Sequence, residues 1–382
     1  MIDEFISSEP LSVGVELELQ LVDNESAELV NGIEPLIDIY PESPYIKPEF
    51  IQNTVELASR VGDNVADVHQ HLLLLAKNLK SHCNQLGIKL CGAGTHPFDE
   101  RLALFTPLPR YQELEKVSGI LGHMQVTFAT HVHIGVQTRD DAIYLFRALK
   151  PYLPLFVALS ANSPFWRGYD TGFVAYRHRI LAASRNYSIP PSFESWDQFC
   201  EFLEASQRAG LLESLRDIHW EIRPRPHLGT VELRVMDAQS TIDEAMQLAA
   251  LARSLASCLL DQQDKINDIL LPHALPWWIE RDNHYSSSRI GLDAGYVFNR
   301  YGDVRSLWSV WDDVAETVQP YAESLGETAY LQRLFTRVSE NRLAYARQRA
   351  RYEESGNTKS IVTALVAELD AELAQVESSN SV

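Results

Sequence analysis

The sequence predicts an α+β protein built on an antiparallel sheet. Three stretches, residues 13–21, 127–136 and 230–236, alternate apolar and polar residues with a period of two. Such alternation is typical of strands that bury one face, as strands of antiparallel sheets often do. Strand-like patterns occupy mainly the first two thirds of the chain, whereas residues 304–375 show helical periodicity. Strands and helices that are separated along the chain indicate the α+β class.

The polar side of each alternating stretch carries a pair of ionisable groups. The pairs, in chain order, are Glu16 and Glu18, His131 and His133, and Glu232 and Arg234. Successive side chains on a strand point to opposite faces, so the two members of each pair share a face. For any one strand, a solvated polar face is the ordinary explanation. However, two glutamates side by side on one strand face repel each other unless a cation lies between them. The three pairs taken together therefore favour a metal-dependent enzyme.

The other elements follow from helical spacing and from the positions of glycine and proline. Further strands are expected at residues 53–58, 88–92 and 218–222. Helices are expected at 63–86, capped by Asp63, at 111–122, at 140–162 with interruptions at Pro151 and Pro154, at 195–209, and at 240–260, capped by Ser240. Residues 25–48, 92–98 and 163–192 have the composition of loops. The last segment is long for a loop in a compact protein, which favours a functional role, and it carries Arg177 and Arg179.

Charge and composition narrow the classes of partner. A net charge of −19 over 382 residues, without a long Lys/Arg run, argues against nucleic acid or an anionic membrane as the main partner. The segment from Arg342 to Arg351 is locally basic, and it is either a solvated helix face or a cluster of guanidinium groups that meets phosphate. The four cysteines have neither C-x-x-C nor zinc spacing. The chain shows no secretory signal and no uninterrupted apolar run of about 18 residues, so we expect a cytoplasmic protein.

Several common catalytic motifs are absent. The sequence lacks a P-loop, a complete dinucleotide fingerprint, an H-E-x-x-H zinc motif and the G-x-S-x-G of hydrolases. His131 and His133 could bind zinc, but the remaining candidate ligands are carboxylates. Oxygen-rich ligand sets suit Mg²⁺ or Mn²⁺ better.

An ordered set of short motifs resembles the glutamate–cysteine ligase type 2 family, and within it the short bacterial carboxylate–amine ligases. The motifs are GVELE at 14–18, GAGTHPF at 92–98, HVH at 131–133, SANSP at 160–164, WEIRP at 220–224 and GTVELRV at 229–235. They follow one another from about Ser12 to Asp237, and a weaker match continues through residues 341–349. Each motif is short, but the ordered set is specific.

The resemblance implies a fold and a reaction. The fold is a curved antiparallel sheet flanked by helices, resembling the catalytic domain of glutamine synthetase. One domain would span residues 1–382, with the sheet within about 11–260, a helical part within about 261–376 and a frayed tail at 377–382. The implied reaction is ATP-dependent joining of a carboxylate to an amine through an acyl phosphate, first of all glutamate and cysteine giving γ-glutamylcysteine. ATP and Mg²⁺ would be the cofactors, with Mn²⁺ as a substitute.

Carried over position by position, the resemblance also implies residue roles. The implied metal ligands are Glu16, Glu18, Glu49, Glu56, His133 and Glu232. Arg234 would meet the transferring phosphoryl group, and Glu56 would share the catalytic role. The implied nucleotide-binding residues are Arg223, Arg177 and Arg179. Glu49 and Glu56 are seven residues apart and cannot share a face of one continuous strand, so Glu49 must lie in the turn after Pro48, or a bulge must intervene.

Two other functions stay open at this level. A metal-dependent phosphotransferase would use the same carboxylates without forming an amide. A non-catalytic metal- or ligand-binding protein would keep the sheet, although cation storage gains nothing from Arg234 or from the arginines of the 163–192 segment. The expected partners are a small carboxylic acid and an amine, and a homodimer is the favoured oligomer. The identity of the amine does not follow from the sequence, because loops assemble its pocket.

Overall fold

The expected antiparallel sheet is the centre of the protein. The computed structural model describes residues 5–184, 187–263, 271 and 275–376, so the tail expected at 377–382 lies outside the described residues. The strands of the main sheet are β1 (Val13–Asp23), β2 (Ile46–Pro48), β3 (Thr54–Ala58), β4 (Ile88–Cys91), β5 (Ala129–Gly135), β8 (Ile222–Arg225) and β9 (Thr230–Asp237). Their order is β2-β3-β1-β5-β9-β8, with β4 pairing to β1 beside this path. Every pairing in it is antiparallel, which confirms the α+β class.

The three alternating stretches form the middle of the sheet, where β5 lies between β1 and β9. Val15 of β1 opposes Val132 of β5, which in turn opposes Leu233 of β9, and all three side chains are buried. They belong to the same apolar core as side chains of the long helices α2 (Val65–Gln85) and α9 (Ile242–Asp261). Because side chains alternate along a strand, the ionisable residues point to the opposite face.

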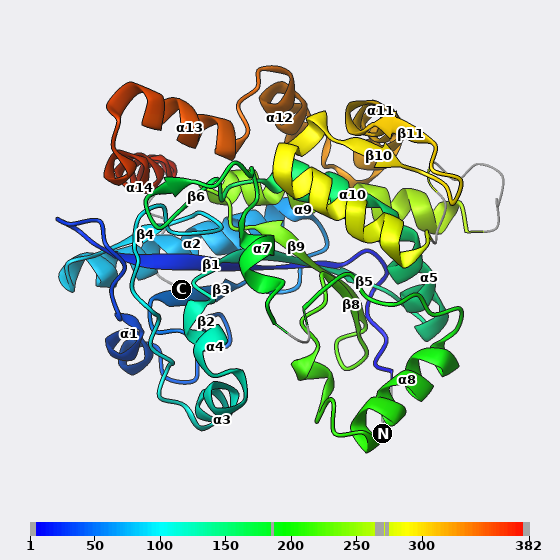
Figure 1. Ribbon diagram of the computed structural model, residues 1–382, viewed down its shortest axis with the longest axis horizontal. Helices are drawn as coiled ribbons and strands as arrows, with labels where there is room; N and C mark the ends of the chain where they lie inside the picture. Colours follow the sequence, from blue (N-terminus) through cyan, green and yellow to red (C-terminus); the bar gives the residue numbers. More distant parts are fainter. Residues whose placement is uncertain (1–4, 185–186, 264–270, 272–274, 377–382) are drawn as a thin grey trace.

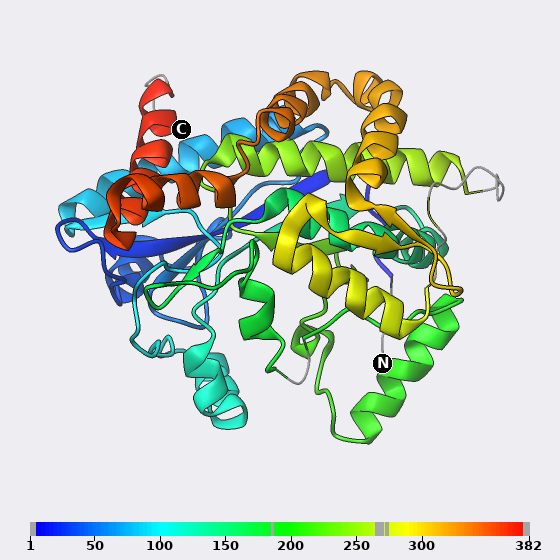
Figure 2. The ribbon, with the colours of Figure 1, turned by 45° about the horizontal axis from the view of Figure 1, so that its top comes forward.

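Helices cover the apolar face of the sheet in two layers. The first layer is formed by α2, α9, α5 (Arg139–Leu149) and α6 (Leu153–Ser160), which contact the central strands. On this layer pack α10 (Trp277–Ile290), α11 (Leu307–Leu325) and α12 (Thr328–Ser339). In Figure 2, α2 and α9 lie above β1, whereas α3 (Pro109–Ser118), α7 (Arg177–Leu181) and α8 (Trp196–Arg208) lie below it. The polar face of the sheet is therefore the face on the side of α3, α7 and α8.

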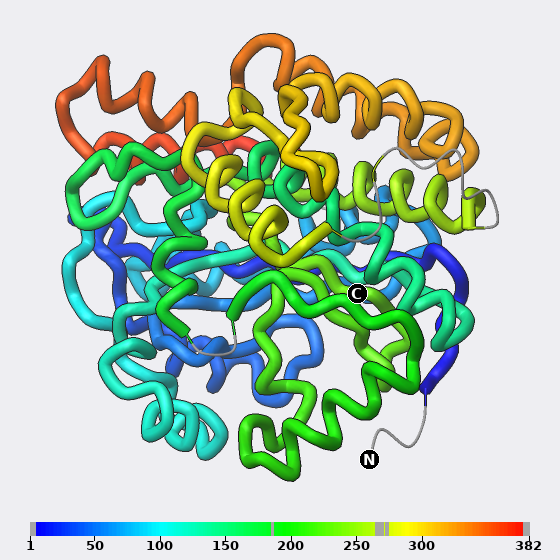
Figure 3. The backbone as a smooth tube through the Cα atoms, turned by 45° about the vertical axis from the view of Figure 1, so that its right-hand side comes forward, coloured from blue at the N-terminus to red at the C-terminus, as the bar shows by residue number. Residues whose placement is uncertain are grey.

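The C-terminal helices return to the N-terminal part of the chain. After α13 (Ala344–Ser355), α14 (Thr358–Gln375) packs against α2 and β4. Lys80 of α2 forms an ion pair of 2.5 Å with Asp370 of α14. Figure 3 shows this red segment beside the blue N-terminal part of the molecule. The remaining short elements are α1 (Ile33–Ile39), α4 (Ile120–Met124), the strand pairs β6 (Phe165–Trp166) with β7 (Tyr169–Asp170) and β10 (Gly295–Val297) with β11 (Val304–Ser306), and 3₁₀ turns at 150–152, 215–217 and 291–293.

The helix boundaries differ slightly from the expected ones. Asn64, not Asp63, caps α2, because its side chain accepts the amide hydrogen of Asp67 at 2.9 Å. Thr241, not Ser240, caps α9 in the same manner. The helix expected at 111–122 is split, since Gly119 adopts a φ of 54° that ends α3 and separates it from α4. The interruption expected at Pro151 and Pro154 is confirmed by the 3₁₀ turn between α5 and α6.

Four expectations for strands and loops were wrong. The segment 25–48, expected as a loop, contains α1 and β2, and the segment 163–192, also expected as a loop, contains β6, β7 and α7. The strand expected at 218–222 lies at Ile222–Arg225, because residues 215–217 form a 3₁₀ turn and the pairing with β9 starts only at Ile222. Residues 304–306 form a strand rather than the start of a helix, and the helical region that follows is divided into α11 to α14. One stretch within the described residues, Arg139–Ser160, has the length and apolar composition of a membrane span, but 89% of its most apolar 18-residue window is buried inside the protein, as in a core helix.

Candidate functional site

Strand register brings the predicted site residues together on the polar face of the sheet. Glu18 of β1 lies directly opposite Glu56 of β3, and Glu16 lies opposite His131 of β5. On the other side of β5, His133 opposes Glu232 of β9. One further strand along, Glu232 opposes Arg223 of β8. The predicted residues of five strands thus form a continuous band across the sheet.

Three carboxylates meet at the β2–β3 end of this band. Glu18, Glu49 and Glu56 place oxygen atoms within 4.8 Å of one another. Burial raises the pKa of Glu18 and that of Glu49 to about 7. Burial, followed by the charges of Glu16 and Glu49, raises the pKa of Glu56 well above its usual range, although Lys47 contacts Glu56 at 3.0 Å. The ionised cluster is therefore unfavourable without a cation.

The register also resolves the spacing of Glu49 and Glu56. Lys47 of β2 opposes Glu56 of β3, and Pro48 opposes Val55. Glu49 directly follows β2 and lies two residues beyond Lys47, so it reaches the same face as Glu56 from a different strand. The chain turns between the two residues. Of the two arrangements considered, the structure therefore shows the first, with Glu49 directly after Pro48.

Two histidines occupy the middle of the band. His131 lies 3.2 Å from Glu16 through Nδ1 and 3.8 Å from Glu18 through Nε2. The Nε2 atom of His133 lies 3.7 Å from Glu16 and 3.9 Å from Glu232. Burial and the charge of Arg234 lower the pKa of His131 to about 4, so its imidazole is neutral at neutral pH. The resemblance assigned a ligand role to His133 alone, whereas His131 joins Glu16 and Glu232 in a second cluster within 4.8 Å. The spacing of two residues, which places both histidines on one strand face, was the sequence feature that indicated both as site residues.

Glu232 lies at the centre of an arginine cluster at the other end of the band. Its carboxylate accepts hydrogen bonds from Arg223 at 2.7 Å, from Arg225 at 3.0 Å and from Arg234 at 2.5 Å. Burial alone would raise the pKa of Glu232, but Arg223 and Arg234 hold it well below its usual range. The three guanidinium groups outweigh the charge of one carboxylate, so the local net charge is positive, which suits a phosphate or a second carboxylate. Arg225 was not among the predicted residues, although it shares a strand face with Arg223.

The other predicted arginines lie at the margin of this band. Arg177 of α7 donates to the backbone carbonyl oxygens of Arg234 at 3.2 Å and Val235 at 3.4 Å. Arg179 lies 3.2 Å from a ring nitrogen of His284. The basic segment from Arg342 to Arg351 lies largely in α13, and its arginines form ion pairs, for example Arg347 with Glu244 and Glu368. Its charges are therefore engaged with carboxylates of the protein.

The donor set of the band fits hard divalent cations. Two clusters of ligand atoms lie along it, one of three carboxylates and one formed by Glu16, His131 and Glu232. The Nε2 atoms of His131 and His133 are buried and have no hydrogen-bond partner among the described residues. Buried polar atoms that lack a partner are costly, by about 1–3 kcal/mol each, and a ligand removes that cost. Carboxylate-rich sets favour Mg²⁺ or Mn²⁺.

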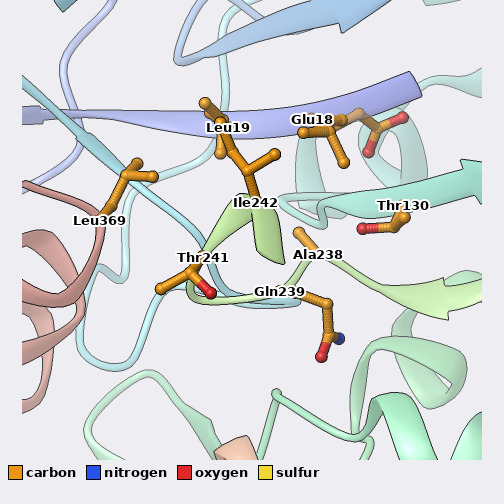
Figure 4. A pocket seen from close by; sticks show the side chains of 9 residues that line it. Glu18, Leu19, Thr130, Ala238, Gln239, Thr241, Ile242 and Leu369 are labelled. Carbon is orange, nitrogen blue, oxygen red and sulfur yellow. The ribbon is translucent and has the colours of Figure 1, made fainter. Parts of the chain in front are cut away.

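Two hollows of the described residues differ from this band in their lining. One is a cavity of about 10 Å³ beside β1, too small for a nucleotide, and Glu18 is the one carboxylate among its mainly apolar lining. Figure 4 shows Leu19, Ile242 and Leu369 around it, on the side of α9 and α14. A larger hollow lies between α11 and α12, where Leu331 and Phe335 line it. Neither hollow is lined by the arginine and carboxylate clusters of the polar face.

Comparisons with known proteins agree with the geometry. The model of glutamate–cysteine ligase family 2 matches residues 12–364. A protein of Trichormus variabilis, provisionally named glutamate–cysteine ligase 2, is 43% identical over 97% of this chain and 96% of its own length. The fold resembles that of a glutamate–cysteine ligase from Francisella tularensis, solved in complex with AMP, with a TM-score of 0.69, 12% identity and coverage of 98% of this chain and 91% of that one.

A second solved structure shares the fold with a longer chain. A bifunctional glutathione synthetase from Pasteurella multocida matches with a TM-score of 0.71 and 14% identity. The match covers 95% of this chain and 53% of that one, so this chain corresponds to about half of the bifunctional protein. The motifs, the sheet and the family match lead to one conclusion. The chain belongs to glutamate–cysteine ligase family 2, a membership that supports an ATP-dependent carboxylate–amine ligase.

Proposed function

We propose that this protein joins the γ-carboxylate of glutamate to an amine, with cysteine as the first amine to test, and does so in the cytoplasm. The observation that carries the proposal is the band on the polar face, where Glu18, Glu49 and Glu56 lie at one end and Arg234 at the other. Carboxylates for metal ions and a guanidinium for phosphate are what phosphoryl transfer from ATP requires. The glutamate and cysteine substrates are suggested by the names of the relatives.

The proposed reaction has two steps. An oxygen of the γ-carboxylate attacks the terminal phosphorus of ATP, the bond to the bridging oxygen breaks, and ADP leaves. The product is an acyl phosphate, whose carbonyl carbon accepts attack because phosphate is a good leaving group. The amine then attacks this carbon, loses a proton and displaces phosphate, which leaves an amide. Neither step requires a covalent nucleophile of the protein, so catalysis depends on positioning and electrostatics.

The predicted ligands divide between the two clusters. Glu18, Glu49 and Glu56 would hold one ion, and a second set would hold another: Glu16, His131, His133 and Glu232. Bound Mg²⁺, or Mn²⁺ in its place, supplies positive charge that neutralises phosphate oxygens. Without substrate, His131 holds Glu16 in place and Arg223 holds Glu232. The protein thus keeps the second set ordered before ATP arrives.

The arginines would stabilise the transferring group. Arg234 shares a strand face with Glu232 and is about one fifth exposed, so its guanidinium can meet a phosphate oxygen without leaving the strand. Arg223 is held by two contacts to Glu232 and would face the nucleotide with less freedom. Glu56 would serve the catalytic step as well as the metal, because it lies beside both Glu18 and Lys47. Arg177 and Arg179 would approach the nucleotide from α7.

Isotope transfer tests this proposal directly. The protein is incubated with Mg²⁺, ATP and glutamate labelled with ¹⁸O in the γ-carboxylate, with and without cysteine. We expect one labelled oxygen in the released phosphate and a γ-glutamyl amide in the mass spectrum. Glu18→Gln should show neither product, whereas Glu316→Gln, an exposed glutamate of α11, should match the wild type.

The same assay separates the alternatives. ADP formed without an amine, together with a stable phosphorylated acid, would identify a phosphotransferase. Label in phosphate with other amines, but not with cysteine, would keep the reaction and replace the acceptor. If no combination of acids and amines releases ADP while Mg²⁺–ATP binds, the protein is a binding protein and the ligase proposal is wrong.

A further inference from the structure

A third set of metal-ligand side chains lies beside the candidate site. It consists of His178 on α7, Glu221 immediately before β8, and His284 on α10. Ligand atoms of the three residues lie within 4.8 Å of one another, and all three side chains are buried. Figure 1 shows α7 below α10 and in front of the sheet, and the cluster joins these three parts of the fold. The family motifs did not single out His178 or His284.

The polar atoms of this cluster converge on one carboxylate. The Oε1 atom of Glu221 lies 2.6 Å from Nε2 of His284 and 3.3 Å from Nδ1 of His178. The hydroxyl group of Tyr187 donates to the same oxygen at 2.8 Å and also lies 2.8 Å from His178. Four nitrogen and oxygen atoms thus surround a small volume, with separations of 2.6 to 3.3 Å. Ligands that share one tetrahedral ion are about 3.3 Å apart for bonds of about 2.0 Å, so these atoms would move slightly apart around an ion.

Hydrogen bonding leaves part of the cluster unsatisfied. The atoms Oε2 of Glu221, Nε2 of His178 and Nε2 of His284 are buried and have no hydrogen-bond partner among the described residues. His284 and Glu221 approach each other at 2.6 Å as an ion pair of two buried groups. Of these three atoms, Nε2 of His284 is one of the four that surround the small volume, whereas Nε2 of His178 lies on the other side of its ring from Nδ1. An ion in that volume would give the buried Nε2 of His284 a partner, which is an argument independent of the ligand types.

We propose that His178, Glu221 and His284 form a site for a zinc-class transition-metal ion, distinct from the carboxylate clusters. Two imidazoles and one carboxylate are a set that suits zinc. The hydroxyl oxygen of Tyr187 provides an adjacent fourth donor. Complete burial agrees with a closed, structural site rather than one that exchanges substrate.

One contact must change when the ion binds. Arg179 donates to Nδ1 of His284 at 3.2 Å, which requires that this nitrogen carry no proton. A metal on Nε2 moves the ring proton to Nδ1, so the guanidinium of Arg179 must turn away from His284. Its guanidinium already lies 5.2 Å from the ring centre of Tyr285, over which it can remain. Zinc would therefore reposition Arg179 as well as tie α7 to the sheet.

The site would act on the candidate site through the backbone. The carbonyl oxygen of Glu221 accepts the amide hydrogen of Arg234 at 2.7 Å. An ion that fixes Glu221 therefore fixes the strand position opposite Arg234. Because Arg177 and Arg179 belong to α7, the same ion would fix where these two side chains enter the polar face.

Metal content of the full-length protein tests the inference without any activity measurement. The protein is produced in zinc-supplemented medium, dialysed against excess Mg²⁺, and analysed by mass spectrometry of the elements. We expect about one zinc per chain in the wild type and at least a ten-fold loss in Glu221→Gln and in His284→Gln. Glu18→Gln removes a carboxylate of the other cluster and should retain the zinc. Zinc below about a tenth per chain in the wild type, or equal zinc in His284→Gln, would overturn the proposal.

Cobalt spectroscopy covers the case in which the glutamine variants fail to fold. In His284→Cys a thiolate replaces the imidazole, so bound Co²⁺ should give a near-ultraviolet charge-transfer band that the wild type lacks. Circular dichroism reports whether this variant is folded. Cobalt bound to folded His284→Cys without that band would show that position 284 is not a ligand. Failure of the metal-free wild type to bind Co²⁺ would likewise refute the site. Because neither readout uses ATP, the result is independent of the proposed ligase activity.

Discussion

Glu18 on β1 and Glu56 on β3 are direct antiparallel partners, so two carboxylates face each other on the buried polar side of the sheet. Like charges directly opposite on neighbouring strands destabilise a sheet. Burial is the main cause that raises the pKa values of both groups, that of Glu18 to about 7. Without a counter-ion, this arrangement therefore destabilises the fold when both groups are ionised. The first two predictions follow from this relationship.

Metal-free protein should lose stability as the pH rises. A carboxyl group whose folded pKa is raised stabilises the fold fully below its unfolded pKa of about 4.5, and this contribution disappears as the pH passes the folded value. For Glu18 and Glu49 the folded pKa is about 7, so the loss falls between about pH 4.5 and 7. Urea unfolding in EDTA across this range should show a decrease of a few kcal/mol. Saturating Mg²⁺ should reduce the decrease, and equal pH profiles with and without Mg²⁺ would contradict the prediction.

Glu18→Gln should separate stability from activity. The change removes one of the mutually repelling charges, so at pH 8 the metal-free variant should be at least as stable as the wild type. Turnover at saturating Mg²⁺ should fall by about 100-fold or more, because a metal ligand is lost. Thermal unfolding and ADP release measure the two effects. Glu316→Gln on the surface of α11 is the matched control, and wild-type turnover in Glu18→Gln would exclude Glu18 from the site.

Arg234→Lys should impair turnover far more than binding. The lysine keeps the charge but loses the planar fork that contacts Glu232 at 2.5 Å. We expect kcat to fall by roughly 100-fold, with only a small change in the KM for the acid. Arg208→Lys, in an exposed pair with Glu204, should have no effect. A change confined to the KM for the acid would instead make Arg234 a clamp for the substrate carboxylate.

Glu327→Gln should weaken the fold without altering the chemistry. Arg253 of the core helix α9 contacts Glu327 at 2.6 Å and also donates to the carbonyl oxygens of Leu11 and Asp63. Removing the carboxylate charge leaves a buried guanidinium without its counter-ion, at a cost of about 3–5 kcal/mol. Urea unfolding measures this loss, and kcat well below the unfolding temperature should be unchanged. A loss below about 1 kcal/mol would show that the backbone contacts alone satisfy Arg253.

The parts of the fold that could be predicted from the sequence are those with strong side-chain periodicity. β1, β5 and β9 each carry apolar side chains on one face and polar side chains on the other, so their alternation is clear and their positions were confirmed. The strands β2 and β8 contain Pro48 and Pro224 and were missed or displaced. Both lie at the ends of the strand order, where a strand has one side without partners and tolerates proline. The prolines therefore made the edge strands β2 and β8 hard to predict from the sequence, whereas the central strands were predicted.

The candidate site shows the same division. Residue pairs on one strand, such as Glu16 and Glu18, share a face whatever the fold, so sequence sufficed to group them. That Glu18 opposes Glu56 depends on the register between strands, which the sequence alone does not determine. His178, Glu221 and His284 come from a short helix, a strand end and a later helix, and their proximity arises only from tertiary packing. No local pattern could have brought them together.

The strand order β2-β3-β1-β5-β9-β8 has a consequence for synthesis of the protein. Until Thr230–Asp237 has been made, β5 has a partner on one side only, although its place in the finished sheet is central. Its backbone N–H and C=O groups then form an open edge beside an apolar face, which invites pairing with other chains. A truncated or slowly released chain that ends before residue 230 should therefore aggregate. A ribosome-bound chain would need protection at β5 for as long as translation of the roughly one hundred following residues lasts.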